Sequence, residues 1–342
     1  MGKFKILSLD GGGIRGSFSA ACLARLEKEL GKPIYKYFDL IAGTSTGGII
    51  AIALALGISA QEIEDFYKEY GEVIFSRRYP LSISWYYKPL LWILKKHYPA
   101  LNSLDFDWFR QTKYDSEPLR EALENVFENK ILKDANRRLV IPSVNLTTGQ
   151  TKVFKTPHQP YFIEDLNYRA VDVVLATTAA PTYFPHTVIK EGSAYVDGGL
   201  WANNPSMIAH TEATKIAELH NEKEIQPKFS AKDIHLLSIG TGIPNYSLEP
   251  PETRAGLGWW IQRLFDVSSI SQSQGVNFQC SYVLGKRYQR INFYLTDEWK
   301  LDAVEKIPNL INIGHEKAIE NFELLKVNFF TEIASDFIPL CE

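Results

Sequence analysis

Two glycine-rich segments near the start of the chain and one aspartate farther along carry residue types that suit ester hydrolysis. The first segment, residues 10–16, reads DGGGIRG, and the second, residues 43–47, reads GTSTG. The aspartate, Asp197, is followed by Gly198 and Gly199. In this order they predict a loop that binds an oxyanion, a serine nucleophile (Ser45) and the carboxylate partner of that serine.

Ser45 lies at the centre of a G-x-S-x-G motif, between a predicted strand at residues 38–42 and a predicted buried helix at residues 48–56. This is the context that a nucleophile elbow requires, because the tight turn holds the serine exposed. Gly43 and Gly47 remove side chains that would clash in such a turn. The N-terminus of the following helix favours the negative charge that develops when a carbonyl is attacked.

The loop of Gly11, Gly12 and Gly13 also follows a predicted strand, at residues 3–9, and precedes a predicted helix, at residues 17–30. Backbone N–H groups in such a loop can bind an oxyanion, and the missing side chains let a substrate approach the backbone closely. Arg15 could add positive charge or brace the loop. We therefore expect these four residues to form the oxyanion hole.

The same loop also fits a dinucleotide-binding fingerprint, Gly11-x-Gly13-x-x-Gly16. That function expects an acidic residue near the end of the second strand, where it binds a ribose. Here the second strand ends in the GTS of the serine motif, and Asp39 precedes the strand. A nucleotide-binding module without enzymatic activity is thus an alternative that only the first half of the fingerprint supports.

Asp197 follows the apolar segment 194–196 and can accept the Ser45 proton directly, as the base of a two-residue dyad. A carboxylate needs a raised pKa for this task, which a partly apolar site supplies. The competing scheme is a Ser-His-Asp esterase that acts on small soluble esters. The histidines lack a glycine-rich or otherwise catalytic context, which favours the dyad: His97, His158, His186, His210, His220, His235 and His315.

Predicted strands and helices alternate along the chain, which indicates a mainly parallel sheet covered on both faces, a three-layer α/β/α fold. We expect one domain over residues 1–342, with an aromatic insertion around residues 77–101 and a C-terminal extension after about residue 242. Besides the elements named above, we predict helices at 60–70, 116–129, 171–180, 205–220, 259–284 and 313–329, and strands at 139–145, 152–154, 194–196, 234–239 and 291–295.

The composition is that of a folded globular protein. The 342 residues are 45% hydrophobic and 23% charged, and a net charge of −3 gives no support for binding a nucleic acid polymer. Cys22, Cys280 and Cys341 form neither a metal-ligand pattern nor a disulfide framework, which is typical of a reducing compartment. No signal-peptide pattern precedes the first strand, so we expect a cytoplasmic location.

The segment 77–101 combines aromatic and aliphatic residues with flanking cations, among them Trp85, Trp92, Arg78 and Lys96. Such a mixture suits a membrane interface. An insertion that is partly buried against the core is the favoured interpretation, because aromatic stripes are usually core. The sequence leaves both interpretations open.

Taken together, the three motifs resemble those of the patatin-like phospholipases. The segment AAPTYFP at residues 179–185 and the Asn203-Asn204-Pro205 sequence strengthen this resemblance, which covers roughly the first 240 residues. It implies a dyad of Ser45 and Asp197, an oxyanion hole from Gly11 to Gly13, and cleavage of fatty-acyl esters from lipids. It implies no metal and no cofactor.

With its aromatic segment and its extension after Gly242, the chain also looks similar to the patatin-like effectors of bacterial anti-phage signalling. That resemblance implies activation by a cyclic dinucleotide, degradation of the cell's own membrane phospholipids and transient contact with the membrane surface. The nucleotide would bind away from Ser45, between the subunits of a homo-oligomer. Trp259 and Trp260 could stack on its bases, although burial within a helix is the alternative for this pair.

Overall fold

A computed structural model describes residues 3–76, 92, 96, 112–160, 162–189, 192–226, 228–245, 257–295 and 299–340. Apart from Trp92 and Lys96, the aromatic segment 77–101 lies outside these ranges. The expectations that depend on it, a membrane contact or a buried insertion, are therefore still open. The division of the chain into one domain with an insertion and an extension also stays a prediction.

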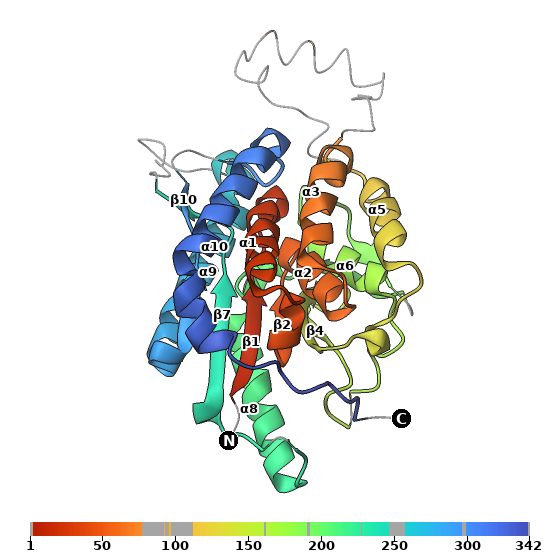
Figure 1. The fold of residues 1–342 in the computed structure, drawn as a ribbon. Coiled ribbons are helices and arrows are strands. Elements are labelled where there is room, and N and C mark those ends of the chain that lie inside the picture. The colour runs from red at the N-terminus through yellow and green to blue at the C-terminus, as the bar shows by residue number, and fades with distance from the viewer. Residues whose placement is uncertain are drawn as a thin grey trace.

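A mixed, mostly parallel sheet forms the centre of the molecule (Figure 1). Its strands follow the order β5-β6-β3-β2-β1-β7-β9, and β4 pairs with β3 beside this path. Strand β1 is parallel to its neighbours β2 and β7, β7 is parallel to β9, and β2 is parallel to the first residues of β3. Both β4 and β6 run antiparallel to β3. The strands are β1 (Phe4–Leu9), β2 (Leu40–Gly43), β3 (Arg138–Asn145), β4 (Gln150–Lys155), β5 (Thr187–Val188), β6 (Ala194–Asp197), β7 (Ile234–Ile239) and β9 (Tyr288–Ile291).

Helices cover both faces of this sheet, which confirms the three-layer α/β/α architecture. Alternate side chains of β1 point to opposite faces, so Leu7 and Leu9 join one buried cluster and Phe4 and Ile6 join another. The first cluster packs under α1 (Gly16–Leu30), α2 (Thr46–Ala55), α3 (Ala60–Ile74), α5 (Glu117–Phe127), α6 (Ala170–Thr178) and α10 (Ile307–Phe329). The second packs under α8 (Ser206–Glu222) and α9 (Leu257–Leu284).

Most of the predicted elements are present with boundaries within a few residues. A capping box of Ser59 and Glu62 begins α3, the helix predicted at residues 60–70, with both of its hydrogen bonds formed. The predicted strand at 291–295 is wrong as a single element, because β9 ends at Ile291 and β10 (Tyr294–Leu295) pairs with β8 (Ile243–Pro244) in a separate small sheet. The break occurs at Asn292, whose side chain accepts hydrogen bonds from the N–H groups of Gly242 and Phe293.

The chain after residue 242 completes the same fold rather than standing apart from it. β9 adds the edge strand beside β7, α9 packs on the face opposite α1, and α10 packs against α1 (Figure 1). Within the described ranges, no helix is both long and apolar enough to cross a membrane.

Candidate active site

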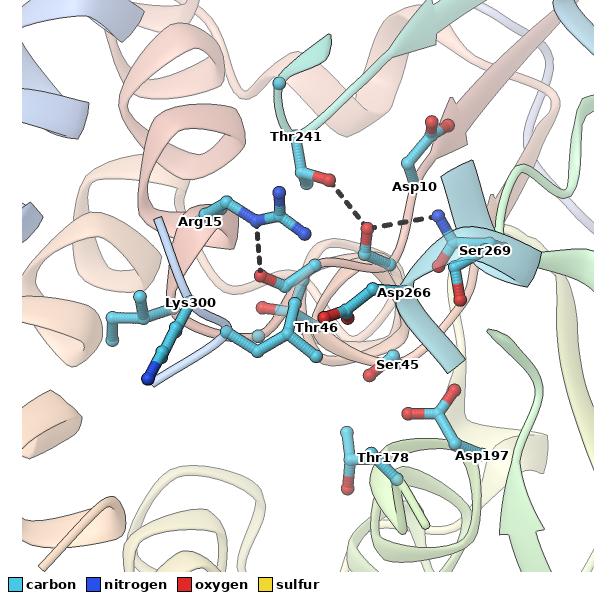
Figure 2. A pocket seen from close by; sticks show the side chains of 18 of the residues that line it. Asp10, Arg15, Ser45, Thr46, Thr178, Asp197, Thr241, Asp266, Ser269 and Lys300 are labelled. Atoms are coloured by element: carbon cyan, nitrogen blue, oxygen red, sulfur yellow. Dashed lines mark hydrogen bonds between the residues drawn. The ribbon is translucent and has the colours of Figure 1, made fainter. Parts of the chain in front are cut away.

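The carboxyl ends of the parallel strands β1 and β2 and the end of the antiparallel strand β6 bring the predicted site residues to one cavity. Ser45 follows β2, the glycine loop follows β1, and Asp197 ends β6. Ser45, Asp197, Arg15 and the loop glycines all line this cavity, and the carboxyl group of Asp197 points toward Ser45 (Figure 2). Residues separated by about 150 positions in the sequence are therefore close in space, as the dyad hypothesis requires.

Ser45 occupies a strained turn immediately before α2. Its backbone has φ 54° and ψ −124°, a conformation that residues with a side chain rarely adopt and that costs on the order of 1–3 kcal/mol. The turn is possible because Gly43 and Gly47 touch, and a Cβ atom on Gly43 would lie 2.0 Å from the Gly47 carbonyl oxygen. This is the geometry of a nucleophile elbow.

Two threonines hold the elbow in place. The Ser45 N–H donates to Thr177 Oγ1 over 3.0 Å, and the Thr177 hydroxyl donates to the Pro142 carbonyl over 2.6 Å. Thr44 donates from its own hydroxyl to the Ala202 carbonyl over 2.6 Å. The strain at Ser45 is therefore held by contacts with β3, α6 and the segment after Asp197.

Asp197 is fully buried beside Ser45, and burial raises its pKa from 3.8 to about 7. One carboxylate oxygen, Oδ1, accepts a 2.6 Å hydrogen bond from the Gly199 N–H. The other, Oδ2, has no hydrogen-bond partner among the described residues. The Ser45 side chain is near enough to offset part of the rise in the Asp197 pKa, although no regular hydrogen bond joins it to Oδ2. An available oxygen and a pKa near neutrality are the properties of a general base.

Hydrogen bonds to two successive carbonyls orient the glycine loop. The Gly11 carbonyl accepts from the Thr241 hydroxyl over 2.6 Å and from Asn203 Nδ2 over 3.4 Å (Figure 2). The Gly12 carbonyl accepts from Arg15 through its side-chain Nε and its backbone N–H, each over 3.2 Å. Because C=O and N–H point in opposite directions across a trans peptide, these bonds also fix the directions of the Gly12 and Gly13 N–H groups.

The hydrogen bonds of this loop leave two of the three predicted backbone N–H donors available to an oxyanion. The Gly11 N–H donates to the Asn203 carbonyl over 2.9 Å, so this donor is already engaged. The N–H groups of Gly12 and Gly13 have no acceptor among the described residues. Arg15 acts on the loop as a brace, one of the two roles considered for it from the sequence.

A buried ion pair that no sequence motif indicates anchors the start of the loop. Arg290, on β9, forms a bidentate pair with Asp10 at 2.6 and 3.2 Å. Ser273, on α9, donates to Asp10 over 2.9 Å and accepts from Asn203 over 3.2 Å. In the sequence Asp10 is only the first residue of the glycine motif, and no local pattern marks an arginine 280 residues away as its partner.

The remaining glycines of the motifs lie where backbones approach each other. A Cβ atom on any of them would come within 3.0 Å of a neighbouring atom. The nearest group is the Thr46 side chain for Gly16, the Leu9 carbonyl for Gly47, the Pro142 carbonyl for Gly198 and the Asp197 carboxylate for Gly199. A side chain at any of these four positions would therefore force a neighbouring group to move.

The lining of the cavity combines apolar and polar side chains. The apolar ones include Ile49, Phe66, Ile74, Leu119 and Phe184. The polar ones include Arg263, Asp266, Ser273, Asn277 and Lys300. Such a lining suits a substrate that joins a hydrocarbon chain to a polar group.

No described histidine lines this cavity, which counts against the Ser-His-Asp alternative. His315 instead pairs with Glu64 at 2.7 Å, and His158 pairs with Glu212 at 3.0 Å inside a buried network. His97 lies outside the described residues. Among those residues no group of His, Cys, Asp and Glu side chains is arranged to hold a metal ion.

A strained serine, a buried carboxyl with a raised pKa and an oriented glycine loop form the arrangement that an acyl hydrolase with a serine nucleophile needs. The model of the patatin-like phospholipase family matches residues 7–210. The chain belongs to this family, and it is a lipid acyl hydrolase. The patatin fold expected from the motifs is thereby confirmed.

Three curated relatives extend the similarity beyond the family region. A cGAMP-activated phospholipase from Vibrio cholerae is 37% identical over 97% of this chain and 96% of its own length. A cGAMP-activated phospholipase from Pseudomonas aeruginosa is 33% identical over 93% of this chain and 86% of its own length. Another from Escherichia coli is 39% identical over 72% of this chain and 65% of its own length.

Proposed function

We propose that this chain cleaves fatty-acyl esters of membrane phospholipids with Ser45 as nucleophile and Asp197 as base. The observation that carries the proposal is the meeting of a strained, cavity-lining serine with a buried carboxyl whose pKa is raised to about 7. At neutral pH a substantial fraction of that carboxyl is ionised and can take a proton.

In the first half of the reaction, Asp197 takes the hydroxyl proton while Ser45 Oγ forms a bond to the ester carbonyl carbon. The carbonyl oxygen becomes an oxyanion, and the N–H groups of Gly12 and Gly13 donate to it. As the tetrahedral intermediate collapses, Asp197 returns the proton to the departing alcohol oxygen, which leaves as a lysolipid. An acyl ester on Ser45 remains.

In the second half, water attacks the acyl ester and Asp197 takes a proton from that water. Collapse of the second intermediate returns a proton to Ser45 Oγ and releases the fatty acid. Each N–H donor to the oxyanion is worth about 3 kcal/mol in the barrier, so the orientation of the glycine loop is central to the rate.

We further propose that a cyclic dinucleotide activates the enzyme and that the active protein contacts the membrane surface from the cytoplasm, within anti-phage defence. The near full-length similarity to a cGAMP-activated phospholipase supports this proposal. The nucleotide would act as an activator and not as a cofactor of the chemistry. A homo-oligomer that holds the nucleotide between its subunits, with Trp260 half-exposed on α9, remains part of the proposal.

Fatty acid release from mixed phospholipid vesicles tests both parts. We expect release by the wild-type protein with cGAMP or another cyclic dinucleotide, and none from Ser45→Ala under any condition. Release that does not depend on a nucleotide would remove the activation and leave a stand-alone lipase. If vesicles stay intact while small soluble esters are cleaved, phospholipids are not the substrate.

A further inference from the structure

A second, apolar cavity lies next to the catalytic one, and the two share a wall. Ile49 and Phe66 line both cavities. Beyond this wall, the second cavity is bounded by Ala53, Ile63, Leu123, Val126 and Phe127. It is therefore built from α2, α3 and α5, and the same three helices contribute apolar side chains to the catalytic cavity.

The second cavity continues the first along one groove between these helices. On α2 the lining passes from Ile49 to Ala53, and on α5 from Leu119 to Leu123, a step of one helical turn in each case. α3 packs against both α2 and α5 (Figure 1). Its residue Phe66 lines both cavities. Since Ala53 lies eight residues after Ser45 on a continuous helix, the groove extends about 12 Å from the nucleophile.

Phe66 is one of the two side chains that form the shared wall. Its side chain is 7% exposed, and its ring centroid lies 5.8 Å from that of Tyr67 and 5.2 Å from that of Tyr70. Tyr67 is held in place because its hydroxyl hydrogen-bonds to Thr46. The Phe66 side chain has no polar atom that could anchor it in the same way.

We propose that the second cavity binds the distal end of the substrate's fatty-acyl chain, and that Ile49 and Phe66 form the gate through which the chain enters. This proposal rests on Ser45 as the nucleophile, because the chain must extend from an ester held there. An acyl chain fits the lining, which is apolar until the polar and exposed side chains of Glu62 and Asn125 at its edge. The groove thus selects for long acyl chains and limits their length where it becomes polar.

Hydrolysis of p-nitrophenyl octanoate and p-nitrophenyl palmitate in detergent micelles, with cGAMP present, tests the proposal through the ratio of the two kcat/KM values. Val126→Trp fills the second cavity from a half-buried position, so the palmitate-to-octanoate ratio should fall about tenfold. Each methylene group excluded from an apolar site lowers the kcat/KM for palmitate by about fourfold, so the exclusion of about two of them accounts for a change of this size. Phe66→Ala removes the gate and should raise the ratio.

Val73→Trp provides the matched control, since Val73 lies on α3 but is 46% exposed and lines neither cavity. We expect it to keep the wild-type ratio. A variant that merely folds poorly lowers both rates together and leaves the ratio unchanged. Equal ratios for Val126→Trp, Val73→Trp and wild type would overturn the acyl groove, whereas hydrolysis that persists in Ser45→Ala would overturn the catalytic proposal instead.

Discussion

Replacing Asp197 with asparagine should abolish catalysis and at the same time stabilise the folded protein near pH 8. The two effects have one cause, the burial of a carboxyl group that must carry charge to work. Its Oδ2 atom has no hydrogen-bond partner among the described residues, and a single N–H, that of Gly199, donates to Oδ1. The asparagine amide is uncharged, so it avoids the desolvation penalty but cannot accept the Ser45 proton.

The size of the effect follows from the pKa. Burial raises the Asp197 pKa from 3.8 to about 7, and each tenfold change in proton affinity corresponds to 1.36 kcal/mol, giving about 4 kcal/mol as an upper limit. Because the folded state holds the proton more tightly, the contribution of Asp197 to wild-type stability falls as the pH rises from about 4 to about 7 and is constant above that. The Asp197→Asn variant lacks this loss, so its advantage should be largest above pH 7 and should shrink toward pH 4.

Urea denaturation of wild type and Asp197→Asn at pH 5 and pH 8 measures this difference in the free energy of unfolding. Hydrolysis of phospholipid vesicles by the same samples should fall by a factor of about 10³ or more. The reasoning is refuted if the variant is destabilised at pH 8, if its advantage is the same at both pH values, or if it keeps substantial activity.

Three further outcomes follow from the site. The kcat/KM of the wild type should rise about tenfold per pH unit up to about pH 7 and then level off, since Asp197 must lose its proton to act as base, and a flat profile from pH 5 to 9 would contradict this role. Thr241→Val keeps the side-chain shape but removes the 2.6 Å hydrogen bond to the Gly11 carbonyl, so kcat should fall about tenfold with KM nearly unchanged in steady-state assays. Ser273→Ala removes a hydrogen bond to the charged Asp10 and should lower the free energy of unfolding by about 2 kcal/mol in urea titrations, together with kcat; equal stability to wild type would show that Arg290 alone anchors the loop.

The sequence predicts the chemistry at Ser45 and Asp197 because each lies in a short motif whose glycines have a local steric role. It predicts the layered fold because apolar strands alternate with helices over most of the chain. It could not predict that the Gly11 N–H is taken by the Asn203 carbonyl, since that bond joins residues 192 positions apart. The same holds for Arg290, whose partner is fixed by the position of β9 beside β7 and by no pattern around it.

The pair formed by Arg290 and Asp10 also sets a limit on how the chain can be divided. The family region ends at residue 210, yet the aspartate that begins its glycine loop is 2% exposed and draws its counter-charge from β9. A protein shortened to the family region would lose this counter-charge and the α9 contact from Ser273, together with β7, which pairs with β1, and α10, which packs against α1. The chain after residue 210 is therefore inseparable from the catalytic region before it, and the two must be inherited, transplanted or redesigned together.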